Sequence, residues 1–296
     1  MIKNIHVFGA NTLTGEFLIS ELKIKIPNLK IIDYSRRNKN SFFIDLENDE
    51  YKILCPKEDH LIINIAPIWI FADFFYKAFN KDPLVLNKLK GVITCSSSSV
   101  ITKKKSRNKF DKDLLIKLNN AEKKLENICN KNNILLTIVR PTLIYGKSIN
   151  KVDKNINFIL RILRITPLII FPRNSGLRQP IHAKQLSEVL VSLTLKTINK
   201  DFNKVYIVNV GGDIEINYLE MINRIRSELG TNDPAKKFII LKIPNKLFFL
   251  LLYPINIFSP RIYGVILRLG SNLSGFTKAS QITGKGIKGF PISPYF

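Results

Sequence analysis

The sequence is poor in the residues that build disulfide frameworks and metal sites. It has three cysteines, an odd number, at the widely separated positions Cys55, Cys95 and Cys129. This spacing does not match a disulfide framework or a zinc site. The three histidines are also far apart, so we expect no bound metal. The composition predicts a reduced, cytoplasmic protein.

Long apolar runs are missing as well. The most apolar stretch, Leu247 to Phe258, reads LFFLLLYPINIF and is interrupted by Pro254. It is too short to cross the hydrocarbon core of a bilayer. The N-terminal residues MIKNIHVFGA lead directly into a strand pattern, so we expect no signal peptide. The wider basic and apolar segment, Leu247–Leu269, leaves three roles open: covering the substrate, contacting a membrane surface peripherally, or packing in the core of a small lobe.

Acidic residues are half as frequent as basic ones. The chain has 46 Lys and Arg against 23 Asp and Glu, which gives a net charge of +23. Such a charge attracts nucleic acid, anionic membranes or phosphorylated ligands. The lysines are nevertheless scattered, and the sequence lacks the interleaved aromatic and basic residues of nucleic-acid-binding proteins. We expect no nucleic-acid partner.

What the sequence does contain is an alternation of strand and helix patterns. Helical runs lie at 14–25 and 113–131, and the second has an apolar stripe at helical spacing. Strand-like segments lie at 4–10, 29–35, 60–67, 90–98 and 134–146. This alternation predicts an α/β fold, a Rossmann-type doubly wound parallel sheet.

A glycine-containing turn lies between the first strand and the first helix. In VFGANTLTG, Gly9 and Gly15 hold the outer positions of a G-x-x-G-x-x-G spacing, and Thr12 holds the middle one. A dinucleotide-binding turn needs glycines for its tight bend, for the approach of pyrophosphate and for helix packing. The context favours a cofactor turn that also includes Asn11 and Leu13, against the alternative of a simple turn from strand to helix.

The second strand ends in YSRR, which brings Arg36 and Arg37 to the same edge of the sheet. Paired arginines suit a ribose 2′-phosphate, whereas an NAD-specific site offers an acidic residue there. This favours NADP(H) over NAD(H); the alternative is a solvated basic turn. Asp45 and Leu46 are placed to flank the adenine ring.

The pattern loosens after Gly146. A strand at 205–212 and a helix at 216–230 are the clear segments there. We therefore predict an NAD(P)-binding Rossmann domain over 1–170. A small C-terminal substrate lobe over 171–296 is partly interleaved with the sheet through a strand near 205–210.

Seven motifs occur in a fixed order: VFGANTLTG, SRR, DL, INIAP, CSSSSV, RPTLIYG and LRQPIH. Together they resemble the atypical or extended short-chain dehydrogenase/reductases, and more narrowly the NAD(P)-dependent epimerase/dehydratase family. The resemblance extends from residue 1 to about 230. It implies that Ala66 and Pro67 of INIAP and Pro141 of RPTLIYG line the cofactor.

The serine cluster CSSSSV carries the chemistry that the resemblance implies. In that family a serine lies three residues before a valine, and Val100 gives this role to Ser97. The resemblance implies that Ser97 binds the substrate oxygen at the carbon that exchanges hydride. It also implies that the adjacent Ser98 contacts the substrate.

The family's tyrosine and lysine dyad is missing, because none of the nine tyrosines has a lysine four residues later. Matching Glu126 to the family's usual helix glutamate puts Leu118 at the tyrosine position and Glu122 at the lysine position. A carboxylate at that place is expected to repel the cofactor phosphates. Two residues are candidates to replace the missing acid/base. Lys103 begins a lysine cluster that could fold over the cofactor or could be solvated. Tyr145 follows the sixth strand and could instead pack a loop.

At the substrate end, Arg178 and His182 match the family's R-x-x-x-H segment. The resemblance implies that Arg178 pairs with the diphosphate of a nucleotide sugar. His182 is catalytic or a structural hydrogen-bonding residue. The implied function is an NAD(P)-dependent oxidoreductase or epimerase with a nonstandard acid/base, acting on a nucleotide sugar or related polar substrate in cell-envelope polysaccharide synthesis. The alternative is a catalytically weakened NADP-binding scaffold or redox-sensing module.

Overall fold

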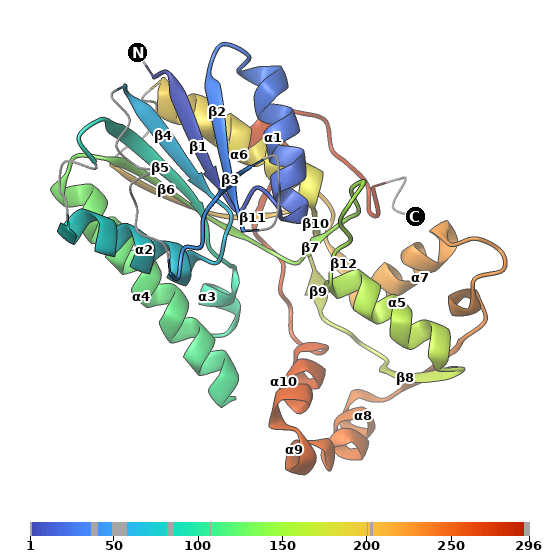
Figure 1. Ribbon diagram of the computed structural model, residues 1–296. Helices are drawn as coiled ribbons and strands as arrows, with labels where there is room; N and C mark the ends of the chain where they lie inside the picture. Colours follow the sequence, from blue (N-terminus) through green and yellow to red (C-terminus); the bar gives the residue numbers. More distant parts are fainter. Residues whose placement is uncertain are drawn as a thin grey trace.

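The computed structural model describes residues 2–36, 41–48, 58–81, 86–106, 108–199, 201 and 204–292. Its centre is an eight-stranded sheet in the order β14-β11-β6-β5-β4-β1-β2-β3 (Figure 1). All of its strand pairs are parallel. The strands are β1 (Asn4–Phe8), β2 (Lys30–Ser35), β3 (Phe42–Phe43), β4 (His60–Asn64), β5 (Leu89–Cys95), β6 (Leu135–Pro141), β11 (Val205–Gly211) and β14 (Thr277–Lys278). The predicted Rossmann-type sheet is confirmed.

Helices cover both faces of this sheet. On one face lie α1 (Leu13–Lys25), α6 (Ala183–Ile198) and α11 (Ala279–Thr283), and on the other lie α2 (Ile68–Lys81) and α4 (Lys109–Lys131) (Figure 1). Every residue of β1 and β4 is therefore buried, as is usual for the central strands of a parallel sheet, and this includes the polar residues Asn4, His6, His60 and Asn64.

The strand order reverses between β1 and β4, which are adjacent in the sheet although β2 and β3 separate them in the chain. In doubly wound sheets the ligand crevice opens at this point, beyond the carboxyl ends of the strands. The turns after β1 and β4 contain Gly9 and Ala66, so two of the predicted cofactor segments lie on either side of this crevice.

A smaller lobe packs beyond the carboxyl ends of the strands (Figure 1). Its elements are α5 (Asn155–Ile165), β8 (Leu168–Pro172), α7 (Tyr218–Glu228), a 3₁₀ helix (Pro234–Lys236), β13 (Ile239–Ile243), α8 (Asn245–Leu252), α9 (Ile255–Phe258) and α10 (Pro260–Arg268). Two short ladders connect it to the sheet: β7 (Ile144–Tyr145) with β10 (Ile181–His182), and β9 (Leu177–Arg178) with β12 (Ile216–Asn217).

The lobe and the sheet are interleaved along the chain. Helix α5 precedes residue 170 but packs with α7 in the core of the lobe, whereas α6, β11 and β14 follow residue 170 and belong to the main sheet. A boundary at residue 170 therefore does not separate two structural units, because the lobe contains segments from both sides of it.

The apolar segment Leu247–Leu269 forms the three short helices α8, α9 and α10. Phe248 is buried, but Leu250, Ile257 and Phe258 point to solvent. Packing in the core of the lobe therefore accounts for Phe248 and not for these three side chains. None of the described helices is both long and apolar enough to cross a membrane.

Candidate functional site

The turn after β1 is packed too closely for a side chain at either of its two glycines. Gly9 has φ +84°, and a Cβ added there would lie 2.6 Å from the Ala66 nitrogen. A Cβ on Gly15 would lie 2.3 Å from the Ala10 oxygen. Thr12, at the middle position, caps α1 because its hydroxyl oxygen accepts from the Gly15 nitrogen at 3.0 Å. The turn therefore offers bare backbone and a helix N-terminus, which is the surface a pyrophosphate needs.

A buried asparagine fixes the opposite turn. The Asn64 side chain donates to the Ala66 carbonyl at 3.2 Å and to the Thr94 hydroxyl at 3.0 Å, and it accepts from the Ala66 nitrogen at 3.1 Å. These bonds hold Ala66 and Pro67 against Gly9 and tie the end of β4 to β5. Sequence reasoning missed Asn64, although a polar residue that ends an apolar strand was a signal.

Arg36 follows β2 and is exposed. Its guanidinium lies 3.4 Å from the Glu47 carboxylate and 3.6 Å from that of Asp45. Exposed pairs of this kind are weak, so a phosphate can redirect the arginine. A hydrogen bond from the Glu47 backbone lowers the pKa of Asp45. Leu46 packs against the core under α2, and Arg37 lies outside the described residues.

The serine cluster leaves the sheet at the end of β5. The Ser98 nitrogen donates to the Pro141 carbonyl at 3.0 Å, so the end of β5 stays joined to the end of β6. Helix α3 (Ser99–Thr102) begins directly afterwards. The Ser97 oxygen accepts from the Ser99 nitrogen at 3.1 Å, and its own proton has no acceptor among the described residues. Ser97 therefore keeps a hydroxyl donor for a ligand.

The neighbouring Ser96 belongs to a buried charged cluster. Arg140 donates from Nε to Glu122 Oε1 at 3.0 Å and from Nη2 to Oε2, and the Ser96 hydroxyl donates to Oε1. Both charged side chains are largely buried. The expected repulsion between Glu122 and the cofactor phosphates is wrong, because Arg140 and Ser96 neutralise and occupy the carboxylate.

The position of this cluster changes which residue of α4 corresponds to the glutamate of the family's helix. The buried carboxylate of α4 is Glu122, whereas Glu126 is half-buried. Matching the family's glutamate to Glu122 moves the tyrosine and lysine positions to Leu114 and Leu118. Neither side chain transfers a proton, so the dyad is absent in both registers.

Lys103 is held by another carboxylate. Its amine donates to Asp111, which also accepts from the Ser106 hydroxyl at 2.8 Å and from Arg268 Nη1 at 2.6 Å. Burial alone would raise the pKa of Asp111, but the hydrogen bonds from Lys103 and Ser106 and the charge of Arg268 keep it below its ordinary value. Lys103 thus connects the loop after α3 to α4 and α10, rather than holding a cofactor ribose.

Tyr145 and His182 pack against each other inside the protein, with ring centroids 5.1 Å apart. The Tyr145 hydroxyl accepts from the Ile292 nitrogen at 3.1 Å, and burial raises the pKa of Tyr145. His182 Nδ1 accepts from the Lys184 nitrogen at 3.1 Å and caps α6. Burial, with the charges of Lys288 and Lys184, lowers the pKa of His182 to about 4. These surroundings favour the packing role for Tyr145 and the structural role for His182.

Arg178 is only 5% exposed. Its Nη1 donates to the carbonyls of Leu177 at 2.7 Å and Ser271 at 2.6 Å, and its Nη2 donates to that of Arg268. The guanidinium also lies 5.3 Å from the centre of the Tyr218 ring. Its hydrogen bonds hold the chain that follows α10, so the structure gives Arg178 a positioning role and no open contact for a diphosphate.

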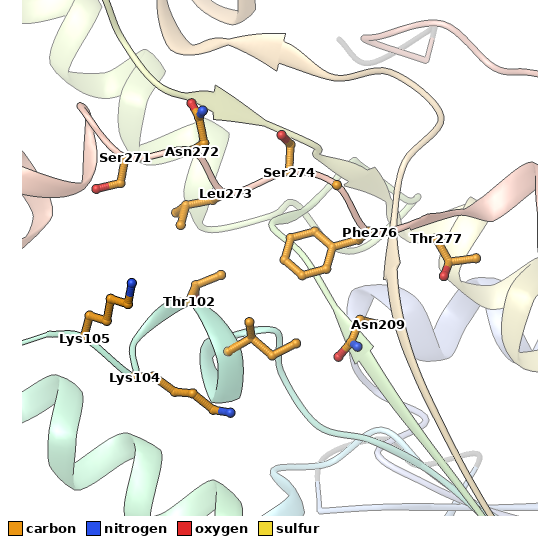
Figure 2. Close-up of a pocket in the computed structure, with 12 residues that line it drawn as sticks. Thr102, Lys104, Lys105, Asn209, Ser271, Asn272, Leu273, Ser274, Phe276 and Thr277 are labelled. Atoms are coloured by element: carbon orange, nitrogen blue, oxygen red, sulfur yellow. The ribbon is translucent and has the colours of Figure 1, made fainter.

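That chain forms one wall of a cavity of about 700 Å³. Figure 2 shows Lys104 and Lys105 on one side, facing the segment Ser271–Thr277 on the other. The lining residues are Ile101, Thr102, Lys104, Lys105, Asn209, Ser271, Asn272, Leu273, Ser274, Gly275, Phe276 and Thr277. The two lysines are the only titratable residues among them. The predicted substrate-contacting residues Ser97, Ser98, Arg178 and His182 are not among the described residues that line this cavity.

Asn209, near the carboxyl end of β11, lines the cavity on the side of Phe276 and Thr277 (Figure 2). Its Oδ1 atom is buried and accepts no hydrogen bond from the described residues. A buried polar atom without a partner costs free energy, so this oxygen is available to a ligand donor. Sequence reasoning missed Asn209 and the segment 271–277, because neither belongs to a recognisable motif.

No protein-family model and no curated protein sequence matches the chain. Solved structures do match, over nearly its whole length. UDP-glucuronic acid 4-epimerase from Bacillus cereus in complex with NAD has a TM-score of 0.65 at 14% identity, covering 97% of this chain and 94% of that one. The chain has the fold of the extended short-chain dehydrogenase/reductases.

Two further structures support the same conclusion about the fold. UDP-N-acetylglucosamine 4-epimerase from Bacillus cereus has a TM-score of 0.63 at 15% identity, covering 97% of this chain and 94% of that one. A human epimerase family protein with NADPH has a TM-score of 0.61 at 13% identity, with 97% and 95% covered. Sequence identities this low establish a shared fold, and the reaction has to be inferred from the residues of the site.

The charged cluster at the serine shelf gives a testable expectation for stability. Arg140→Met leaves the Glu122 carboxylate buried without its cation, which should lower the free energy of unfolding by about 3–5 kcal/mol. Chemical denaturation measures this change. In the double variant Glu122→Gln/Arg140→Met both charges are gone, so stability should return to within about 1–2 kcal/mol of the native chain. Equal losses in the single and double variants would contradict the account.

Proposed function

We propose that the protein is an NAD(P)-dependent oxidoreductase or epimerase that acts on a nucleotide sugar. One observation carries the proposal: the tight turn at Gly9, which has no room for a Cβ, and the lysine-lined cavity both lie at the carboxyl ends of strands of one doubly wound sheet. In such sheets cofactor and substrate meet across the carboxyl ends of the strands. The matched structures with NAD, with NADPH and with UDP sugars in their names support this assignment.

The residues at the strand ends fit a nicotinamide dinucleotide. The backbone from Gly9 to Gly15, with Asn11 and Leu13, receives the pyrophosphate at the start of α1. Ala66, Pro67 and Pro141 line the remainder of the cofactor. When bound, the nicotinamide supplies the acceptor or donor of hydride. Ser97 orients the substrate oxygen through its unpaired hydroxyl proton.

We infer a preference for NADP(H) from the end of β2. Arg36 is exposed there and makes only weak contacts with Asp45 and Glu47. A 2′-phosphate offers the guanidinium a stronger, bidentate partner. Arg37 follows directly in the sequence and adds a second charge in this proposal.

The cavity suits the anionic part of a nucleotide sugar. Its volume of about 700 Å³ lies within the usual range of small-molecule sites. Lys104 and Lys105 neutralise the diphosphate, while Asn209 Oδ1 accepts a hydrogen bond from the sugar or base. Because these lysines are the only titratable residues among the described residues that line the cavity, we infer that one of them replaces the missing tyrosine as the acid/base, which takes up the hydroxyl proton when the sugar is oxidised and returns it when the sugar is reduced.

The cellular setting follows from the cysteines and the substrate class. Cys95 and Cys129 are free thiols, as in a reducing cytoplasm. Nucleotide sugars are the activated units of polysaccharide synthesis, so we place the reaction in the formation of cell-envelope polysaccharide.

The second candidate is an NADP-binding scaffold without turnover. The leucines at 114 and 118 favour it, because they leave the usual proton-transfer positions inert. Redox sensing by Cys95 or Cys129 is disfavoured, since burial raises the pKa of both thiols to about 12; Cys55 lies outside the described residues. Such thiols stay protonated and react slowly.

The cofactor assignment predicts a selective loss in Arg36→Ala. Affinity for NADP should fall about tenfold or more, because a charge-assisted contact to the 2′-phosphate is removed. Affinity for NAD should change less than about twofold. Isothermal titration calorimetry measures both, and Arg161→Ala, an exposed arginine of the lobe, is the matched control. Equal losses for NADP and NAD would refute the 2′-phosphate assignment.

The catalytic assignment predicts reduction of bound NADP when a UDP-hexose is added, followed by absorbance in a single turnover. Ser97→Ala should slow this step about a hundredfold with unchanged cofactor affinity, and Ser227→Ala on α7 should leave it unchanged. Lys104→Gln and Lys105→Gln should weaken sugar-nucleotide binding, and the one that removes the acid/base, which accepts the hydroxyl proton as NADP is reduced, should also lower the rate. Tight NADPH binding without turnover, for every UDP-hexose tried, would favour the scaffold.

A further inference from the structure

The far end of the C-terminal lobe consists of the short helices α8, α9 and α10. We call residues Asn245–Arg268 the apolar tip. Figure 1 shows these helices at the extremity of the molecule, beyond the sheet. Helix α10 contacts the start of α4 through Pro260 and Arg268, and α8 and α9 lie farther out.

The tip exposes large apolar side chains from all three helices. Leu250 is 70% exposed, Ile257 75% and Phe258 87%, and α9 has no buried residue. Large apolar side chains exposed together at one end of a protein are typical of an interaction site. A proline precedes each of α8 and α9 and begins α10, so the backbone holds these side chains outward on short, rigid segments.

The strands that lead into the tip extend the same apolar character. Ile239 pairs with Leu168 and Leu241 with Ile170, which places four aliphatic side chains on one face of the β8–β13 ribbon. All four are exposed. Strand β13 continues through Pro244 into α8, and α8 packs against β8. Exposed apolar side chains thus occur both on the ribbon and on the helices that follow it.

The charge of this region is positive and unbalanced. The sequence contains no Asp or Glu after Asp233. Lys237, Lys242 and Lys246 are exposed, and none of them forms an ion pair with a described residue. Lys246 lies in the first turn of α8, where the helix dipole disfavours a cation. An external anion would compensate these charges.

We propose that the apolar tip docks on the surface of an anionic lipid bilayer. Short helices with exposed leucine, isoleucine and phenylalanine, flanked by lysine, insert their apolar side chains at the headgroup boundary. Each lysine near such a surface adds electrostatic attraction to anionic lipids. A second copy of the chain fits less well, because two tips would bring the same unbalanced positive charges together.

The tip is connected directly to the cavity described above. The chain leaves α10 at Arg268, and Ser271 and Asn272 already line the cavity. The main-chain carbonyls of Arg268 and Ser271 are held by Arg178. Docking would therefore place the wall of the cavity within a few residues of the membrane surface.

The test is co-sedimentation of the full chain with vesicles of phosphatidylcholine alone and with about one third phosphatidylglycerol. We expect binding to the anionic vesicles, weak binding to the neutral ones, and a decline as salt is added. Ile257→Ser/Phe258→Ser should reduce the partition coefficient about tenfold or more. Lys242→Gln/Lys246→Gln should reduce it about fivefold per lysine on anionic vesicles only.

The matched apolar control is Ile149→Ser, which changes a side chain 99% exposed in the loop after β7, outside the tip. It should bind vesicles like the native chain. Thermal unfolding by circular dichroism should show that Ile257→Ser/Phe258→Ser stays folded, since both side chains are exposed. The proposal is overturned if the native chain does not sediment with anionic vesicles, or if this double variant binds equally well. It is also overturned if the native chain forms a dimer that the double variant abolishes while vesicle binding is nil.

Discussion

The buried contact between Arg140 and Glu122 fixes the place where β5 and β6 leave the sheet. Arg140 lies near the end of β6, Glu122 projects from α4, and Ser96 lies just beyond β5. Joining the three requires a complete set of hydrogen bonds, since a buried carboxylate without its cation is strongly destabilising. Ser97 follows directly, so the position of the proposed substrate hydroxyl depends on this contact.

Two other buried polar groups position the lobe against this shelf. Asp111 receives Lys103 and Ser106 from the loop after α3, and Arg268 from the end of α10. Arg178 holds the main chain immediately after α10. The contacts of Asp111 and Arg178 together fix the two walls of the cavity. This explains why Lys103 and Arg178, which the sequence suggested as ligands of cofactor or substrate, position the protein chain instead.

The sequence predicted the features that arise from local pattern. Alternating strands and helices gave the parallel sheet, and the spacing of Gly9 and Gly15 gave a turn whose packing leaves no room for a Cβ. The absence of the tyrosine and lysine dyad was also readable from spacing alone. The sequence pattern that predicts each of these features is local, although the packing that results, such as Ala66 against Gly9, joins distant strands.

The features that sequence reasoning missed depend on contacts between distant segments. Asp111 and Arg268 are 157 positions apart, so nothing near Lys103 indicated that its amine was already bound. Arg178 matched a substrate motif, yet its partners are main-chain carbonyls up to 93 positions away. The cavity combines α3, β11 and the segment 271–277, a combination that only the folded chain reveals.

The central claim is that a nicotinamide dinucleotide binds at the Gly9 turn, and the single tryptophan allows a direct test. Trp69 lies in the first turn of α2, two residues after Pro67. Titrating NADPH while exciting tryptophan should quench the Trp69 emission in a saturable way and produce nicotinamide emission by energy transfer. Quenching that only follows the absorbance of added NADPH, without nicotinamide emission, would contradict the claim.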